Sequence, residues 1–366
     1  MGDIAVIFGG PSPEHDVSIL TGLQAVRELT KTKSVIAIYW TKTGSFVEVD
    51  ASLEASAFAD GVPKASSPVE LRIGVGFVSE GKRLSKDRVL EIDAAILCTH
   101  GGPGEDGTLQ GALDLAGISY AGPSVAGAAI GMDKLAFSSV LSDHGIAVLP
   151  RRALTEELDG VDFNGPYIVK PRFGGSSIGI DVVADFATAK ARLSTNVHLR
   201  SGAVIEPFRA DLADLQIAVR TYPTLQLSAI ERPIKTSNAS EILDYRDKYV
   251  GGEGMASAPR ELPATLSEER TAQVHAAATA VVSLASIRGV ARIDFMEGEA
   301  GCFVNEVNTI PGSLARYLFI EPPVSFGQLL GDLVAEAIER PTHRYSSAGA
   351  DGLVLRGAAS IAAKLA

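Results

Sequence analysis

The fold of this chain is decided by residues 289–318, GVARIDFMEGEAGCFVNEVNTIPGSLARYL, in which two alternating runs flank a glycine-containing turn. Side chains alternate along a strand, so Arg292 and Asp294 share one face of the first predicted strand, and Glu306 and Asn308 share one face of the second. If the two strands pair with these faces aligned, the four side chains converge. Two carboxylates and an amide are hard oxygen donors suited to Mg²⁺. The alternative is an ordinary hairpin with a solvated charged face.

Composition limits the class of protein. A length of 366 residues predicts two or three lobes rather than one core. The net charge of −11 argues against nucleic acid as the main partner. Cys98 and Cys302 lie in apolar runs and are predicted to be buried free thiols, which excludes a disulfide framework or zinc site. We find no signal peptide and no membrane-spanning run, so we expect a cytoplasmic protein without a membrane partner.

The first 120 residues are typical of an open α/β lobe. An apolar strand at 4–8 ends in two glycines, and a loop carrying Glu14 leads into a helix near 17–29 and a strand at 35–39. This order predicts parallel strands, with Glu14 either at a ligand position or simply capping the helix. Residues 50–90 are predicted to form loops, edge strands and at most one short helix. A strand at 94–98 then leads into a glycine-rich loop containing His100, followed by a helix near 108–116.

The middle of the chain carries a phosphate-binding pattern. A helix is predicted over 124–145 and carries Lys134. A strand over 167–172 then delivers Lys170 into a Gly-Gly-Ser-Ser loop that contains Ser176 and Ser177. Small residues let backbone N–H groups approach an anion, while the hydroxyl groups and the lysine add donors and charge. The spacing is not that of a Walker A loop, and a flexible hairpin loop is the alternative.

The last third of the chain is predicted to contain strands and amphipathic helices around a long loop. Glu206 ends a short strand, and antiparallel strands follow at 215–220 and 226–230. A polar loop from 231 to 258 is predicted to act as a lid. We expect helices at 267–286 and 325–338, and a peripheral tail from 341 with a short helix at 358–365.

These segments, taken in order, resemble the ATP-grasp superfamily and, more narrowly, the D-alanine–D-alanine ligases. The resemblance spans Ile4 to about Arg340 through FGGPSPEHDVS, THGGPGEDGTLQGALDLAGISYAGPS, MDK, VKPRFGGSSIG, DYRDKY, ARIDF and NEVNTIPG. It implies an α/β protein with an N-terminal α/β substrate-binding lobe (1–123), a small central ATP-grasp lobe (124–208) and a C-terminal antiparallel-sheet catalytic lobe (209–345). Residues 346–366 then form a peripheral tail.

The resemblance also implies the cofactors and the residues that bind them. ATP would lie between the central and C-terminal lobes, contacted by Lys134, Lys170, Ser176, Ser177, Glu206, Asp214 and Lys248. Two Mg²⁺ ions, with Mn²⁺ as an alternative, would be bound by Asp294, Glu306 and Asn308.

Further roles follow for the amino-acid substrates. Glu14 would orient the first ammonium, and Glu14, Ser176 and Tyr249 would form a hydrogen-bonded set between the N-terminal lobe and the lid. His100 would lie beside the first carboxylate. Arg292 and the Gly312 N–H would stabilise the oxyanion.

Two positions depart from the family pattern. Tyr317 stands where the family places a serine that holds the second substrate's carboxylate, so Arg316 or Ser313 would have to replace that contact. Pro207 replaces a lysine beside the adenine site. Tyr249 matches the members that form dipeptides rather than D-alanyl-D-lactate.

The reaction implied by the resemblance is ATP-dependent joining of two D-alanines through an acyl phosphate, for peptidoglycan precursors. The alternatives are a ligase with a different second amino acid, and a nucleotide-binding homologue that does not ligate. We expect small amino acids as substrates and a homodimer as the assembly.

Overall fold

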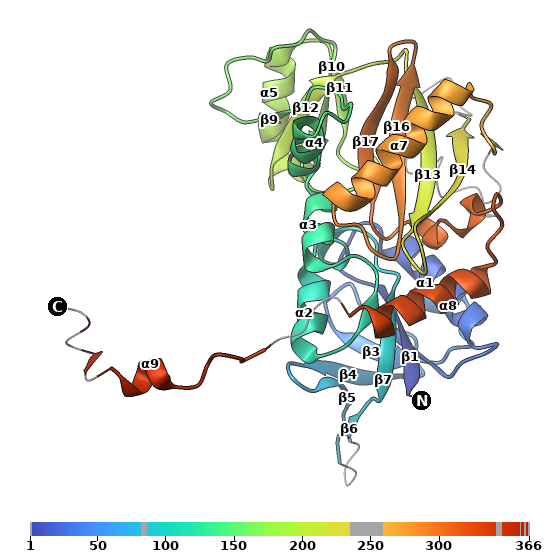
Figure 1. The fold of residues 1–366 in the computed structure, drawn as a ribbon, viewed down its shortest axis with the longest axis vertical. Helices are drawn as coiled ribbons and strands as arrows, with labels where there is room; N and C mark the ends of the chain where they lie inside the picture. Colours follow the sequence, from blue (N-terminus) through green and yellow to red (C-terminus); the bar gives the residue numbers. More distant parts are fainter. Residues whose placement is uncertain are drawn as a thin grey trace.

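Three β-sheets organise the part of the chain described by the computed structural model, which comprises residues 2–81, 86–234, 259–341, 346–358, 360, 361 and 364. Each sheet is built mainly from one region of the sequence. The eight-stranded sheet lies within residues 3–121, the four-stranded sheet within 152–207 and the five-stranded sheet within 213–308. Figure 1 shows the first sheet at one end of the molecule and the other two at the opposite end. This arrangement agrees with the predicted α/β class.

The eight-stranded sheet has a parallel centre and an antiparallel extension. Its order is β6-β5-β4-β3-β2-β1-β7-β8, and β2, β1, β7 and β8 run parallel. The bounds are β1 Asp3–Gly9, β2 Val35–Trp40, β3 Phe46–Val49, β4 Ser66–Arg72, β5 Gly76–Ser79, β6 Arg88–Val89, β7 Ile92–Leu97 and β8 Tyr120–Ala121. The parallel strands agree with the prediction from the strand–loop–helix–strand order. The apolar runs of β1 and β7 are typical of strands in a parallel sheet that is buried on both faces. Residues 66–89 pair more extensively than predicted and widen the sheet by three antiparallel strands.

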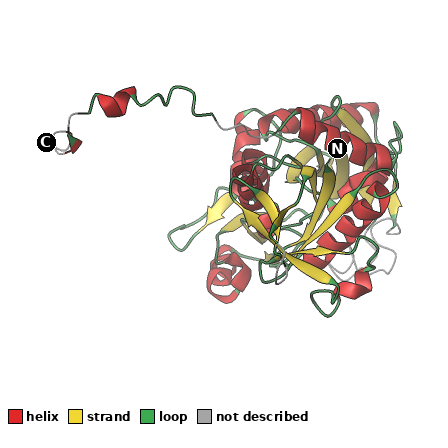
Figure 2. Cartoon of the chain, turned by 90° about the horizontal axis from the view of Figure 1, so that it is seen from below, coloured by secondary structure: helices red, strands yellow, loops and turns green. Residues whose placement is uncertain are grey.

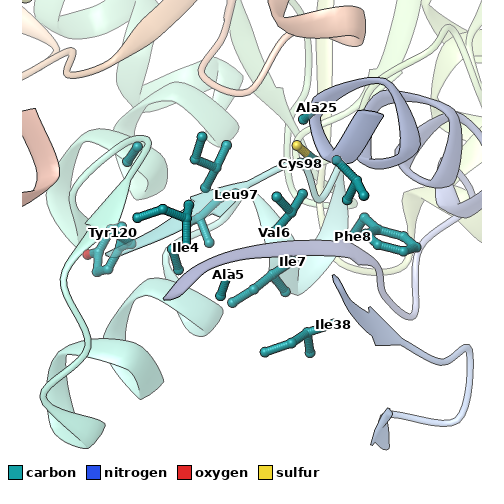
Figure 3. Close-up of a cluster of buried hydrophobic side chains, with 14 of the residues drawn as sticks. Ile4, Ala5, Val6, Ile7, Phe8, Ala25, Ile38, Leu97, Cys98 and Tyr120 are labelled. Carbon is teal, nitrogen blue, oxygen red and sulfur yellow. The ribbon is translucent and has the colours of Figure 1, made fainter. Parts of the chain in front are cut away.

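The core of this lobe is formed by β1 and its neighbours. Ala5, Val6, Ile7 and Phe8 are fully buried, and Figure 3 shows them packed among Ile38, Leu97, Cys98 and Tyr120. Three helices cover the sheet: α1 His15–Leu29, α2 Thr108–Ala116 and α8 Phe326–Glu339. Helix α8 comes from the far end of the chain yet packs on β7, β8 and α1. The C-terminal part of the chain therefore helps to close the N-terminal core.

The four-stranded sheet has the order β11-β10-β12-β9 and is antiparallel. Its elements are β9 Arg152–Leu154, β10 Tyr167–Pro171, β11 Asp181–Val183, α5 Phe186–Thr195, η3 Val197–Leu199 and β12 Ala203–Pro207. Helices α3 Val125–Met132 and α4 Lys134–Asp143 lead into it. The prediction of one helix over 124–145 was wrong, because Asp133 leaves the helical conformation and its carboxylate caps α4 by accepting the N–H groups of Leu135 and Ala136.

The five-stranded sheet contains the hairpin predicted within residues 289–318. Its order is β15-β14-β13-β16-β17, with helix α7 Glu268–Leu284 on one face. The strands are β13 Ala213–Arg220, β14 Gln226–Pro233, β15 Arg260–Glu261, β16 Val290–Gly298 and β17 Gly301–Asn308. The predicted pairing is confirmed: Asp294 lies opposite Glu306, and Arg292 lies opposite Asn308.

The predicted lid and tail are tested only in part. Strand β14 runs to Pro233, so the start of the lid predicted at Glu231 was wrong, and residues 235–258 lie outside the described part. In the tail, helix α9 comprises Leu353–Arg356 and so precedes the helix predicted at 358–365. The structure describes only four positions of that predicted helix. Figures 1 and 2 show the tail leading away from the body of the molecule.

The remaining elements are short 3-10 helices: η1 Ala55–Phe58, η2 Gly102–Gly104 and η4 Gly312–Leu318. Cys98 and Cys302 are free, the first buried and the second half-buried. Within the described ranges, no helix has the length and apolar character needed to cross a bilayer.

Candidate active site

A cavity lies between the four-stranded and five-stranded sheets. It encloses about 1100 Å³ of space not filled by atoms, part of it open to solvent, which suffices for a nucleotide-sized ligand. One wall carries Lys170 and Glu206 from β10 and β12, and the other carries Asp294 and Glu306 from β16 and β17. Further lining residues from the sequence prediction are Lys134, Ser176, Ser177, Pro207 and Asp214. Residues predicted to bind ATP and metal therefore line the same cavity.

A buried ion-pair network forms the first wall. Glu206 is almost completely buried and accepts hydrogen bonds from Arg151 Nε at 2.7 Å and Lys170 Nζ at 3.0 Å. Burial alone raises the pKa of Glu206, but the charges of Arg151 and Lys170 outweigh it and hold the pKa at about 2. Arg151 also donates to the carbonyl oxygens of Lys134 at 2.6 Å and Asn305 at 3.2 Å. A single arginine thus joins helix α4, strand β12 and strand β17 around the cavity.

Lys134 reaches the phosphate-binding loop from the start of α4. Its Nζ donates to the carbonyl oxygen of Gly174, and its backbone N–H donates to Arg172 O at 3.1 Å. Arg172 forms two hydrogen bonds with the carboxylate of Asp133, at 2.8 and 2.6 Å. Burial lowers the pKa of Lys134, although Glu306 opposes this effect. The loop that begins at Gly174 is therefore tied to helix α4 on one side.

Glu14 ties the same loop to the N-terminal lobe. Ser176 Oγ donates a hydrogen bond to Glu14 Oε1, which joins two of the three members of the predicted Glu14–Ser176–Tyr249 set. The space around Glu14 is closed by two glycines: a Cβ at Gly101 would lie 2.3 Å from Glu14 Oε2, and one at Gly175 would lie 3.1 Å from it. Gly101 has φ +63°, so both its conformation and its position require glycine.

Tyr249 and Lys248, also predicted as site residues, lie outside the described part of the chain.

The candidate metal ligands occupy one face of the hairpin. Asp294 accepts hydrogen bonds from Arg292 Nε at 2.7 Å, Arg292 Nη2 at 2.8 Å and Asn308 Nδ2 at 3.2 Å. Glu306 lies opposite Asp294 and lines the cavity. Across the described ranges, no three His, Cys, Asp or Glu side chains form a complete metal-binding cluster. The donor set fits Mg²⁺, which takes one or two carboxylates from a protein and the rest from phosphates and water.

A second, smaller cavity adjoins the first. It encloses about 390 Å³ and shares Lys134, Gly174, Gly175 and Glu306 with the larger one. Its other lining residues include Glu14, Glu105 and Asn308. A small amino acid in this cavity would lie between the phosphate-binding loop and the N-terminal lobe, which is the place predicted for the first substrate.

His100 is held by protein groups on both ring nitrogens. Its Nδ1 lies 2.7 Å from Ile310 O, so Nδ1 carries the proton, and Nε2 accepts a hydrogen bond from Thr21 Oγ1 at 2.8 Å. Burial lowers the pKa of His100 to about 4, so the ring is neutral. The Ser313 N–H donates to Thr21 Oγ1 at 3.0 Å. In this structure both ring nitrogens of His100 therefore contact protein groups, and Nδ1 holds the loop after β17.

Glu105 is a buried carboxylate at the junction of the two lobes. It accepts the N–H groups of Gly101 and Ile310, each at 3.0 Å, and the hydroxyl of Thr309 at 3.3 Å. Burial and the neighbouring charge of Glu14 raise the pKa of Glu105 to about 7.

Sequence reasoning missed both Arg151 and Glu105. The available signals were the charged pair Arg151-Arg152 before a strand and an acid within the glycine-rich loop, and neither identifies a partner.

The segment after β17 places the remaining predicted residues. Gly312 and Ser313 begin η4, in which Ser313, Leu314 and Ala315 have φ near +50°. Arg316 is exposed, and its guanidinium lies over the ring of Phe326, 5.2 Å from the ring centroid. The guanidinium of Arg260 lies over the ring of Tyr317, 4.8 Å from the ring centroid.

Comparisons with known proteins agree with this geometry. Residues 3–123 match the family described as "D-ala D-ala ligase N-terminus", and residues 127–339 match "D-ala D-ala ligase C-terminus". A D-alanine–D-alanine ligase of Corynebacterium aurimucosum is 31% identical over 354 residues, covering 92% of this chain and 98% of the relative. One from Nitratiruptor sp. is 32% identical over 317 residues, covering 86% and 89%.

Solved structures give the same result. The D-alanine–D-alanine ligase of Helicobacter pylori superposes with a TM-score of 0.74 and 26% identity, covering 94% of this chain and all of that one. A D-Ala:D-Ser ligase from Enterococcus faecalis has a TM-score of 0.75 and 25% identity, covering 91% and 98%.

Proposed function

The chain belongs to the D-alanine–D-alanine ligase family, and we propose that it joins two D-alanine molecules at the expense of ATP for peptidoglycan precursor synthesis. The ATP-grasp fold and ATP-dependent ligation are properties of this family. The observation that carries the proposal is the composition of the larger cavity, where Lys134, Lys170 and the loop at 174–177 face Asp294 and Glu306. Cations and small residues on one wall with carboxylates on the other suit a nucleotide triphosphate and its metal.

In the first step the carboxylate of one D-alanine attacks the γ-phosphorus of ATP, which gives an acyl phosphate and ADP. Lys134 and Lys170 bind the phosphates, and the backbone of the loop carrying Ser176 and Ser177 covers them. Glu14, already bonded to Ser176, orients the ammonium of the same D-alanine from the N-terminal lobe. Glu206 orients Lys170, and Asp214 lies on the cavity wall for the ribose.

Mg²⁺ would be held by Asp294, Glu306 and Asn308. When bound, it neutralises charge on the transferring phosphoryl group. Arg292 donates to both oxygens of Asp294, so its guanidinium is held beside the carboxylate that would bind the metal.

In the second step the amine of the second D-alanine attacks the acyl carbon, and phosphate leaves with the bonding electrons. Arg292 and the Gly312 N–H stabilise the oxyanion. Tyr249 and Lys248 keep the roles that the resemblance implies, in closing the site and contacting ATP.

The test is a coupled assay of phosphate release with ATP, Mg²⁺ and D-alanine, with the dipeptide identified by mass spectrometry. Asp294→Ala and Glu306→Ala should each reduce turnover at least 1000-fold while the far-UV circular dichroism stays unchanged. Glu299→Ala, in the exposed turn of the same hairpin, is the matched control and should retain activity. Normal turnover in both cavity variants would refute the metal assignment.

The same assay separates the alternatives. If D-alanine reacts only when a different second amino acid is supplied, the result favours a ligase with another acceptor. The D-Ala:D-Ser ligase among the structural neighbours is an example of such an enzyme. ATP binding without turnover over a broad amino-acid panel would favour a homologue that does not ligate.

We further propose that the protein is a cytoplasmic homodimer. Within each chain, the lobe boundaries are proposed to lie near residues 123, 208 and 345. Exposed apolar side chains at Ile73, Val75 and Leu115 lie close together on the N-terminal lobe, because Gly74 N donates to Leu115 O at 2.9 Å. Such a patch favours self-association. Light scattering after size exclusion measures the mass directly, and a monomer at micromolar concentration would exclude the dimer.

A further inference from the structure

A buried polar cluster lies beside Arg292, outside the lining of the nucleotide cavity. It consists of Glu231 on β14, Arg260 on β15 and Tyr317 on η4, and we call it the acceptor-side cluster. None of its members lines either cavity described above. The reaction described so far gives these three side chains no role.

The sheet places this cluster in register with the candidate metal site. Glu231 pairs with Gln216 of β13, Gln216 pairs with Asp294, and Asp294 pairs with Glu306. Directly paired residues share a face of a sheet, so Glu231 lies in the same row as the metal ligands, two strands beyond Asp294. Helix η4 packs over β13, β14 and β16, which brings Tyr317 onto this face.

Charges hold the cluster together. Arg260 Nη1 donates to Glu231 Oε1 at 2.9 Å, and the same guanidinium lies over the ring of Tyr317. Arg292 and Asp294 are close enough to influence both Glu231 and Tyr317 electrostatically. The cluster therefore adjoins the side chain that serves the second step of the reaction.

Two polar atoms of the cluster are buried without a hydrogen-bond partner within the described part of the chain. They are Glu231 Oε2 and the hydroxyl of Tyr317, and the Glu231 side chain is only 5% exposed. A buried unpaired carboxylate oxygen or hydroxyl is costly, so such atoms call for a partner that the described residues do not supply. An acceptor oxygen and a hydroxyl in one cluster suit a ligand group that both donates and accepts a hydrogen bond.

The position of the cluster indicates which ligand this is. In the proposed function the nucleotide takes the larger cavity, and the first amino acid takes the smaller one, which Glu14 and Glu105 line. The second amino acid must reach the acyl carbon from another side, and Arg292, Gly312 and the acceptor-side cluster form that side.

On the basis of the proposed function, we propose that Glu231 and Tyr317 bind a hydroxyl or amino group on the side chain of the second amino acid. Arg260 fixes the orientation of both residues. The methyl group of D-alanine would leave the two polar atoms of the cluster unpaired. The enzyme should therefore prefer a polar acceptor to an apolar acceptor of equal size, because unpaired buried groups oppose binding of the apolar one.

The experiment supplies D-alanine as donor and an equimolar mixture of D-serine and D-2-aminobutyrate as competing acceptors. The two acceptors differ only in that a hydroxyl replaces a methyl. Mass spectrometry gives the ratio of the two mixed dipeptides, which we expect to favour D-alanyl-D-serine by about tenfold or more. Equal amounts, or an excess of the 2-aminobutyrate product, would overturn the inference. Phosphate release with D-alanine alone is measured first, so failure of the proposed function is recognised separately.

Two variants locate the preference. Tyr317→Phe and Glu231→Gln should each bring the product ratio toward one. Tyr222→Phe, on a half-buried tyrosine whose hydroxyl donates to Glu339, should leave the ratio unchanged. Tyr317→Phe removes an unpaired hydroxyl, so its melting temperature should equal or exceed that of the wild type. A lower melting temperature with an unchanged ratio would show that the hydroxyl is structural and would refute the proposal. If Glu231→Gln does not fold, Tyr317→Phe alone decides.

Discussion

Glu206 stays ionised in the interior because Arg151 and Lys170 lie on either side of it. Removing one partner of a buried ion pair leaves the other charge desolvated, which costs far more than loss of an exposed pair. Sequence analysis placed Lys170 and Glu206 in one site but gave Arg151 no role. Arg151 lies 55 residues before Glu206 and 154 before Asn305, and no local pattern links positions so far apart.

We therefore expect Arg151→Met to lower the free energy of unfolding by about 3 to 5 kcal/mol in urea titrations without ligands. The matched control is Arg152→Met at the next position, where the pair with Asp162 is exposed and its loss should cost less than about 1 kcal/mol. The Arg151 variant should also bind ATP more weakly in calorimetric titrations, because Lys170 loses its fixed position. Equal stability losses in the two variants would contradict this account.

At the scale of elements, the β16–β17 hairpin and the turn that follows it differ in how far sequence predicts them. The hairpin follows from alternation within 17 residues, and its strands pair with the two predicted polar faces aligned. The left-handed conformation of Ser313–Ala315 cannot be predicted in this way, because none of these residue types favours positive φ. It is imposed by Thr21 and His100, which hold Ser313 N and Ile310 O from the other lobe. The break at Asp133 could have been predicted, since aspartate is a strong N-cap.

Strain in this turn can be measured with two buried alanines. Ala315 and Ala278 are both fully buried, but Ala315 has φ +48° whereas Ala278 lies within the right-handed helix α7. Ala278→Gly should destabilise the protein by about 1 kcal/mol or more. A left-handed conformation costs alanine about 1 to 2 kcal/mol, and Ala315→Gly removes this cost. The Ala315→Gly variant should therefore have a free energy of unfolding about 2 kcal/mol higher than that of Ala278→Gly. Identical unfolding curves would show that the turn is not strained.

At the scale of the whole molecule, Glu105 joins the lobes that build the two halves of the site. Its carboxylate binds Gly101 within its own lobe and Thr309 and Ile310 from the loop after β17. Each sheet draws on a separate stretch of chain, so its strands could be predicted from local patterns. The contacts between the lobes could not, since they join residues about 205 positions apart. The orientation of the lobes, which decides where a donor amino acid lies, therefore had to come from the structure.

Glu105 also gives the lobe junction a defined pH dependence. Its pKa rises from 4.5 to about 7 on folding, so the folded protein binds this proton more tightly than the unfolded chain. The resulting stabilisation is complete below about pH 4.5 and is lost as the pH rises to about 7, a change on the order of 3 kcal/mol. Glu105→Gln imitates the protonated side chain at every pH. Relative to the wild type, this variant should therefore gain about 3 kcal/mol between pH 4.5 and pH 8 in urea unfolding of the ligand-free protein. Asp106→Asn, at the next position, controls for a general change in charge, and an identical pH slope in wild type and Glu105→Gln would remove Glu105 as the titrating group.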